Sequence, residues 1–227
     1  MNANDKVANL LEKKETLDKK RDELILQVME TDRKIEDLCS EIIALQVADL
    51  KVGETITFGE HEGEPIEWIA IDQKEGATLL LSKEIVSYQP FEMNWEYMIN
   101  PCLEWKNCEI RKWLNDEFIY DAFSDAERKF VQVTEVQNYT LWDPVGAIET
   151  RELTHDFLFL LSIEEMEDWY DDERTKDPLE EEWYLRTPIL FDGEEYVSFA
   201  CDKSASYNMG DEYLRVGVRP AFWLKNK

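Results

Sequence analysis

The side chains that most often perform catalysis are few in this chain and far apart in the sequence. Its 227 residues include two histidines, His61 and His155, and four cysteines. Neither histidine has a nucleophile at a recognisable spacing, so no Ser/His/Asp-type catalytic set is visible. Pairs of carboxylates suited to glycoside hydrolysis can be drawn almost anywhere among the 51 acidic residues, so they carry no signal. We expect no catalytic residues and a protein that is not an enzyme.

Metal and disulfide chemistry is equally poorly supported. The spacing of Cys102 and Cys108 does not match a zinc knuckle, and only the two histidines could complete such a site. The densest acidic stretch, Glu164–Glu182, lacks the regular alternation of oxygen ligands and the turn glycine of a calcium loop. Four cysteines in a chain of this length do not make a disulfide framework. We expect no metal site and no cofactor.

The segment from Asp202 to Tyr213 is the best candidate for binding chemistry. It is polar, rich in Tyr, Ser and Asn, and lies between two expected strands. These residue types dominate adaptable binding loops because they combine contact area with hydrogen bonding. The alternative interpretation is an ordinary connecting loop. The residues expected to contact a ligand are Tyr207, Asn208, Asp211 and Tyr213, with Trp142 and Trp95 from irregular segments as secondary candidates.

The net charge of −26 limits the partners that the chain can have. Residues 1–48 hold 11 acids and 8 bases, so residues 49–227 hold 40 acids and 17 bases, a net charge of −23. Such a surface repels nucleic acid and anionic membranes, and it could attract a basic protein. No apolar signal core and no run of 18 apolar residues is present. We expect a cytoplasmic protein that binds neither nucleic acid nor membrane directly.

The first element expected in the chain is a long helix at its start. Apolar residues recur there in two interleaved seven-residue registers, and neither Pro nor Gly occurs before Gly53. This pattern predicts a coiled-coil oligomerisation helix over residues 1–48. Thr31 interrupts one register, and Lys14 and Arg21 occupy the other. The residues expected to form the seam are Val7, Leu10, Leu17, Leu24, Val28, Ile35, Leu38, Ile42 and Leu45.

The same registers indicate the partner of this helix. β-branched residues in the first register with Leu in the second favour a parallel dimer through residues 7–45. In a parallel pair Lys13 would face Asp18 of the other chain, an opposite-charge contact. Leu11, Ile25 and Cys39 widen the apolar face. They leave two alternatives open, a trimer or docking of the helix onto the globular part of its own chain.

Residues 53–227 contain the pattern of one α+β domain. Several short strands are expected, beginning with Thr55–Phe58 and Pro65–Ile71 and including a buried strand at Phe157–Leu161. Helices are grouped in the middle: one begins near Ile110 with Asn107 as its cap, and capping boxes start two more at Ser124 and Ser162. Short strands with two or three helices between them predict an α+β fold.

The domain also resembles a known family. Residues 53–227 are similar to the domain of unknown function number 6273, an uncharacterised family common in Firmicutes. The motifs that carry the resemblance are Gly53–Gly59, Pro65–Trp68, Leu79–Ser82, Ile110–Asn115, Phe159–Ser162, Trp183–Pro188 and Gly217–Leu224. The last two look like the closing strands of a C-type-lectin-like fold. The resemblance therefore implies a lectin-like domain and places Asp202–Tyr213 on its ligand surface.

Departures from the lectin-like group argue against its known activities. Calcium-dependent lectins use a Glu-Pro-Asn or Gln-Pro-Asp loop followed by Trp-Asn-Asp near the C-terminus. Here Gln89-Pro90 comes far too early, and the nearest counterpart of the second motif, Trp113–Asp116, is interrupted and helical. Formylglycine-generating enzymes need a close cysteine pair, and Cys201 stands alone in the corresponding part.

Three arginines in the family-like motifs, Arg111, Arg186 and Arg219, have two interpretations. Their planar guanidinium groups could hold a carboxylate or phosphate ligand. We favour a structural role, in which carboxylates or carbonyls of the chain itself pair with them, because buried arginines need such partners.

The sequence thus predicts a non-enzymatic module that recognises protein or glycan and is displayed on a coiled-coil oligomer. An acidic adaptor or inhibitor that engages a basic protein is the alternative. An enzyme of the formylglycine-generating type is a third, less favoured hypothesis.

Overall fold

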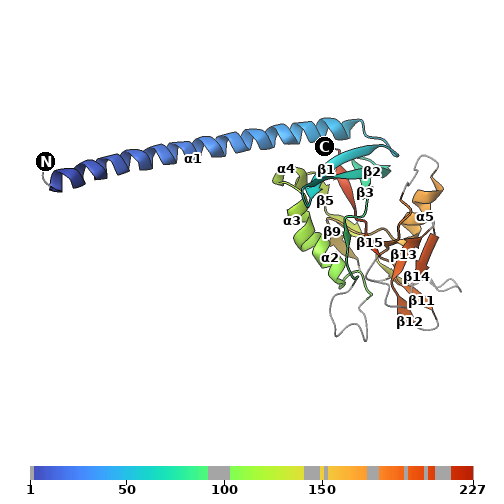
Figure 1. Ribbon diagram of the computed structural model, residues 1–227. Coiled ribbons are helices and arrows are strands. Elements are labelled where there is room, and N and C mark those ends of the chain that lie inside the picture. Colours follow the sequence, from blue (N-terminus) through green and yellow to red (C-terminus); the bar gives the residue numbers. More distant parts are fainter. Residues whose placement is uncertain are drawn as a thin grey trace. The chain divides into compact units, whose positions relative to one another are not determined.

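The computed structural model describes residues 3–91, 103–140, 149–150, 153–172, 179–191, 194–201, 204–207 and 216–226. The chain forms two compact units, Met1–Ile42 and Ile43–Lys227. Helix α1 (Ala3–Ala48) makes up the first unit, and its last turns belong to the second (Figure 1). The second unit combines mixed sheets with short helices, so the predicted α+β class is confirmed.

Helix α1 is continuous because its sequence contains neither Gly nor Pro and carries ion pairs between successive turns. Lys14 and Asp18 approach to 2.7 Å, and two further pairs at the same four-residue spacing approach to 2.8 Å. None of the helices in the described residues is long and apolar enough to cross a membrane.

The first sheet of the second unit has five strands and curls into half a barrel. All of its pairings are antiparallel. In spatial order the strands are β1 (Thr55–His61), β2 (Glu64–Lys74), β3 (Ala77–Ser82), β16 (Ala221–Lys225) and β5 (Val131–Gln132). The last strand of the sequence therefore lies inside the sheet, between strands made much earlier.

The second sheet also has five strands, with one parallel pairing between β10 and β15. Its strands in spatial order are β14 (Ser204–Tyr207), β13 (Ser198–Cys201), β10 (Trp183–Tyr184), β15 (Gly217–Val218) and β4 (Ser87–Tyr88). Three two-stranded sheets complete the strands: β6 (Thr134–Val136) with β9 (Thr154–Asp156), β7 (Tyr139–Thr140) with β8 (Glu149–Thr150), and β11 (Ile189–Phe191) with β12 (Glu194–Tyr196).

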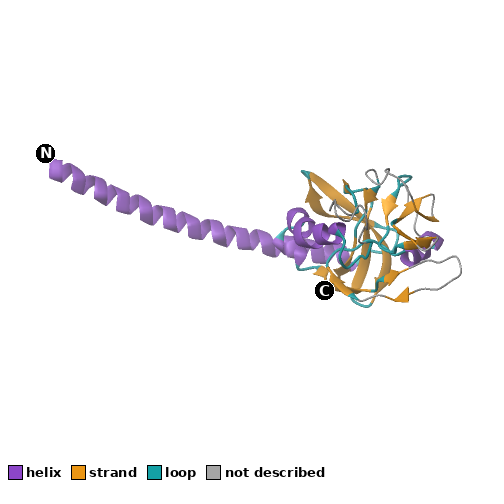
Figure 2. Cartoon of the chain, turned by 90° about the horizontal axis from the view of Figure 1, so that it is seen from below, coloured by secondary structure: helices purple, strands orange, loops and turns teal. Residues whose placement is uncertain are grey.

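The short helices, purple in Figure 2, all lie between residues 109 and 171 of the chain. They are α2 (Glu109–Trp113), a π-helical turn (Leu114–Phe118), α3 (Ile119–Ala122), α4 (Asp125–Arg128) and α5 (Ile163–Asp171). The capping boxes predicted at Ser124 and Ser162 are confirmed, since each serine accepts from the backbone of a glutamate three residues later. The predicted cap at Asn107 is wrong: Cys108 occupies the cap position and makes no side-chain capping bond.

An aromatic cluster lies at the centre of the first sheet. Trp68 and Phe222 meet edge to face with their centroids 4.7 Å apart, and Phe58 and Phe123 close around them. The indole of Trp68 is fully buried and donates to the carbonyl of Phe58 at 2.6 Å. Burial of such large side chains supplies much of the hydrophobic stabilisation of the unit.

The strand predicted at Phe157–Leu161 is wrong, although residues 158–161 are buried as expected. Its backbone groups do not form a continuous row of hydrogen bonds with a neighbouring strand. They form hydrogen bonds with side chains and with single backbone groups of other segments. Asn115 accepts from the backbone N–H groups of residues 157 and 158, and Phe159 exchanges two hydrogen bonds with Ala221. The guanidinium group of Arg186 donates to the carbonyl of Leu160, and the backbone N–H of Arg186 donates to the carbonyl of Leu161. The apolar run is correct, but its hydrogen-bond partners are not visible in sequence.

Gly59 and Gly76 give a matched pair for testing how closely β1 approaches the carbonyl oxygen of Ala122. Both have a positive φ, +77° and +78°. A Cβ at residue 59 would lie 2.7 Å from the carbonyl oxygen of Ala122, whereas one at residue 76 would meet nothing within 4 Å. We expect Gly76→Ala to cost about 1 kcal/mol of unfolding free energy, and Gly59→Ala at least about 2 kcal/mol more. Urea denaturation of both variants measures the difference, and equal costs would contradict the close approach.

Candidate functional site

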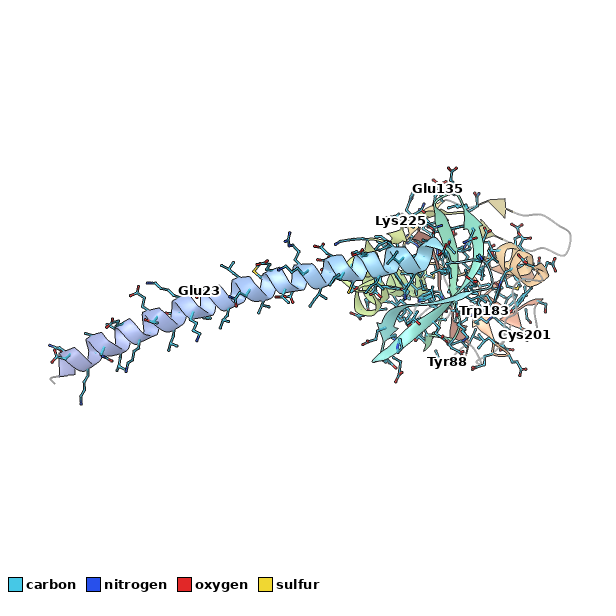
Figure 3. All side chains as sticks on the ribbon, turned by 90° about the horizontal axis from the view of Figure 1, so that it is seen from above. Glu23, Tyr88, Glu135, Trp183, Cys201 and Lys225 are labelled. Carbon is cyan, nitrogen blue, oxygen red and sulfur yellow. The ribbon has the colours of Figure 1, made fainter. Side chains whose placement is uncertain are left out.

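The seam residues of helix α1 are large apolar side chains that lie exposed on the described chain. All nine predicted positions are more than half exposed, from 51 % at Leu24 to 69 % at Leu45. Figure 3 shows side chains projecting from the helix along its length. An apolar stripe of this length is not stable in water without a partner. The long N-terminal helix and its exposed leucines suggest a coiled-coil oligomerisation segment.

Two cations in the seam are neutralised by their own helix. The carboxylate of Asp18 lies 2.7 Å from Nζ of Lys14 and 3.3 Å from Nη1 of Arg21. The hydrogen bond with Lys14 lowers the pKa of Asp18 and raises the pKa of Lys14. Arg21 also pairs with Asp22 at 2.9 Å, so two carboxylates serve the two cations and these seam positions carry less net charge than their residue types indicate.

The middle of the first unit is apolar beyond the seam. A shallow groove there is lined by Leu17, Leu24, Ile25, Val28 and Met29, with Lys20 and Arg21 at its margin. Leu26, on the far side of the helix, is 67 % exposed, and Met29 is 62 % exposed. The apolar face of the helix is therefore wider than the seam, as predicted from Leu11 and Ile25, and both of these side chains are at least half exposed.

At its end, helix α1 presents two different faces. Ile43 and Val47 are buried in the core of the second unit with exposures of 7 % and 1 %, and Leu50 follows them. Leu45, which lies between these two residues in the sequence, is 69 % exposed. The last turn of the helix therefore exposes a seam residue on one face and buries Ile43 and Val47 in the domain core on another.

The structural interpretation of the three arginines is confirmed. Arg111 contacts Asp156 through Nε at 2.7 Å and Nη2 at 2.6 Å. Arg186 is bidentate to Glu165, with Nη2 and Oε1 2.8 Å apart. Burial raises the pKa of Glu165, but the charge and hydrogen bonds of Arg186 outweigh it and hold that pKa below its ordinary value.

Arg219 is fully buried between two tryptophans. Its guanidinium carbon lies 5.1 Å from the ring centre of Trp169 and 5.2 Å from that of Trp183. Nε donates to the carbonyl of Ser82 at 2.6 Å, so the arginine joins the end of β3 to the second sheet. These contacts occupy the side chain within the core and give it a structural role.

Of the six predicted ligand residues, Tyr207 alone lies within the described residues. Tyr207 ends strand β14, where its backbone is in register with Ser198 of β13. Asn208, Asp211, Tyr213, Trp142 and Trp95 lie outside the described residues, so their predicted role stays a prediction. What the structure does show is the hairpin of β13 and β14 that leads into the 208–215 segment, at one edge of the second sheet.

The histidines and cysteines occupy separate environments. His61 packs against the rings of Phe118 and Trp113, whereas His155 lies 3.8 Å from Glu135 on the neighbouring strand. Cys201 is the last residue of β13. Among the described residues, no three His, Cys, Asp or Glu side chains are grouped as metal ligands would be.

Comparison with known proteins gives one match. A family model described as a domain of unknown function, DUF6273, matches residues 75–226. Five of the seven motifs lie in this range, and Gly53–Gly59 and Pro65–Trp68 precede it. Neither a curated protein nor a solved structure matches the chain.

Proposed function

Because the chain belongs to the DUF6273 family, whose description carries no activity, we propose a function from the contacts of the chain itself. The protein is a non-enzymatic recognition module for protein or glycan, with a C-type-lectin-like domain displayed on a coiled-coil oligomer. The exposed seam of helix α1 is the observation that carries this proposal.

The flanks of the seam favour a parallel pair. One flank carries Lys6, Lys13, Lys20 and Lys34, and the other carries Asp18 and Asp32. In a parallel pair the lysine flank of each helix faces the acidic flank of the other, so Lys13 meets Asp18 of the second copy. An antiparallel pair through the same seam would place lysines against lysines. Charge therefore supports the orientation that the seam residues favour.

Recognition is assigned to the segment that follows β14. Its predicted contact residues Tyr207 and Asn208 stand in the sequence at and just after the end of β14, an edge strand of the second sheet. Two domains on one stalk would gain avidity from weak individual contacts, because the second contact is made at high effective concentration. Oligomerisation and recognition are thus parts of one function.

A four-protein comparison tests this proposal. Leu17→Glu with Leu24→Glu removes two seam leucines, and Asn9→Glu with Thr16→Glu adds the same charges on the outward face. We expect light scattering to show an oligomer for the wild type and the outward control, and a monomer for the seam variant, since two buried carboxylates per helix oppose pairing.

The same proteins are then used to retain partners from a lysate of the native host. The seam variant should retain at least about tenfold less partner than the control, and Tyr207→Ala should lose partner without changing the oligomer. A seam variant that stays oligomeric, or equal retention by all four proteins, would overturn the proposal.

The acidic adaptor is the second candidate, and helix α5 favours it. Glu164, Glu167, Asp168 and Asp171 are all exposed on this helix. A basic partner held there would be released by moderate salt. Retention that is lost at high salt, but is unchanged by Tyr207→Ala, would select the adaptor over the recognition module.

A further inference from the structure

A chain of hydrogen bonds ties the end of helix α1 to β2, β3 and the residue after β16. Nε2 of Gln73, on β2, donates to the carbonyl of Leu50 at 2.5 Å and to the hydroxyl of Thr78, on β3, at 3.2 Å. The hydroxyl of Thr78, which is fully buried, donates in turn to Oδ1 of Asn226 at 3.2 Å. Together with the burial of Val47, these contacts fix the last turn of the helix within the second unit.

The last turn of α1 has little stability of its own. The final carbonyl groups of a helix lack partners within it, and cations near that end of a helix compensate for their partial negative charge. The last turn of α1 contains no basic residue. A helical turn is also costly to form without contacts to other parts of a protein. The contacts of the second unit are therefore what keeps this turn helical.

The apolar part of the seam is concentrated towards the same end of α1. Lys14, Arg21 and Thr31 interrupt the registers earlier in the helix, and polar residues at such positions lower the stability of a coiled coil. From Ile35 to Leu45 every register position is apolar. Leu45 is 69 % exposed, although it lies in the sequence between two residues of the domain core. Pairing of α1 therefore depends most on the end of the helix that the domain holds.

We propose that the folded domain and the oligomer formed through helix α1 stabilise each other. The proposal rests on the proposed function, since it needs a helix that assembles. The domain keeps the last turn helical, which holds Ile42 and Leu45 in the seam. Pairing of the seam in turn fixes the helix that contributes Val47 to the core. Such a coupling is reciprocal, because each equilibrium favours the other by the same factor. It restricts the oligomer to chains whose domain is folded.

The helix and the domain can be followed separately during unfolding. All eight tryptophans lie in residues 68–227, so tryptophan fluorescence reports on the domain. Helix α1 contains 46 residues, more than the other described helices together, so far-UV circular dichroism reports mainly on α1. If the two are coupled, both signals change in one transition. A helix that only tethers the domain would lose its ellipticity in a transition of its own.

Urea denaturation of the full chain at about 1 µM and about 100 µM tests the coupling. For a coupled dimer we expect the fluorescence midpoint to rise by about 0.5 M urea over this range, because dissociation accompanies unfolding of the domain. Circular dichroism should give the same midpoint as fluorescence at each concentration. The seam variant, Leu17→Glu with Leu24→Glu, should show no rise. The outward control, Asn9→Glu with Thr16→Glu, should show the rise of the wild type.

Gln73→Ala tests the coupling in the opposite direction, from the domain to the oligomer. Gln73 lies on β2, outside helix α1. Loss of its hydrogen bond to the carbonyl of Leu50 should loosen the last turn and weaken the oligomer about threefold to tenfold in sedimentation equilibrium. Glu75→Ala, at an exposed position of the turn after β2, is the matched control and should leave assembly unchanged. Fluorescence without urea shows that both variants are folded.

The outcomes separate the coupling from the proposed function. A wild type that is oligomeric by light scattering, but whose fluorescence midpoint is the same at both concentrations, would overturn the coupling alone. So would a separate helical transition in circular dichroism, or a Gln73→Ala variant that assembles as tightly as Glu75→Ala. A wild type that is monomeric at both concentrations would overturn the oligomer of the proposed function and the coupling with it.

Discussion

Replacing Asp156 by Asn is expected to lower the free energy of unfolding by about 3–5 kcal/mol. The Asp156 carboxylate has no exposed surface and accepts from four donors. Two belong to Arg111, one is the indole N–H of Trp105 at 2.8 Å, and one is the hydroxyl of Thr154 at 2.8 Å. An amide keeps the shape but loses the charge, and its NH₂ group faces donors in place of an acceptor.

Glu135→Gln is the matched control for this substitution. Glu135 lies on β6, which pairs with the strand that carries Asp156, and its side chain is 62 % exposed. Its removal is expected to change the unfolding free energy by less than about 0.5 kcal/mol. Chemical denaturation followed by tryptophan fluorescence measures both variants. Similar small losses in the two would show that the buried carboxylate is not a centre of stability.

Val47→Asp and Leu45→Asp are expected to separate folding from assembly. Val47 is 1 % exposed in the core, so a carboxylate there should cost at least about 4 kcal/mol of unfolding free energy. Leu45 is 69 % exposed in the seam, and its replacement should leave the domain folded while weakening the oligomer. Circular dichroism at low concentration and light scattering at high concentration measure the two effects.

The reverse outcome, a folded Val47 variant with an altered oligomer, would place Val47 in the interface between copies. This pair also fixes where a shortened chain can begin. Deletion through residue 48 removes Ile43 and Val47 from the core, whereas deletion through residue 36 keeps them.

The periodicity of the sequence made helix α1 predictable. The seam could be predicted because a seven-residue repeat depends only on residue type and spacing, and all nine residues are exposed as a seam requires. The capping boxes were readable for the same reason, since Ser124 and Ser162 each act on a residue three positions away. Ile43 and Val47 lie outside the repeat, and only the fold shows that they are core residues.

Long-range polar contacts were not predictable in this way. Asp156 is one of 51 acids, and Asn115, which binds the backbone of residues 157 and 158, has no local signature. One signal was present for Asp156: it alternates with His155 and directly precedes an apolar run, so it occupies an inward position of its strand. The arginines were predictable in role, since burial demands partners, but their partners were not.

The place of β16 in the first sheet sets an order of events during synthesis. The sheet cannot close until Ala221–Lys225 has been made, because β16 separates β3 from β5. Helix α1 ends at Ala48, more than 170 residues earlier. At about 5–20 residues per second the ribosome needs roughly 10–35 s for that interval. Throughout it helix α1 is complete while the domain is not, so the exposed leucines of the helix are present on the nascent chain before the first sheet can close.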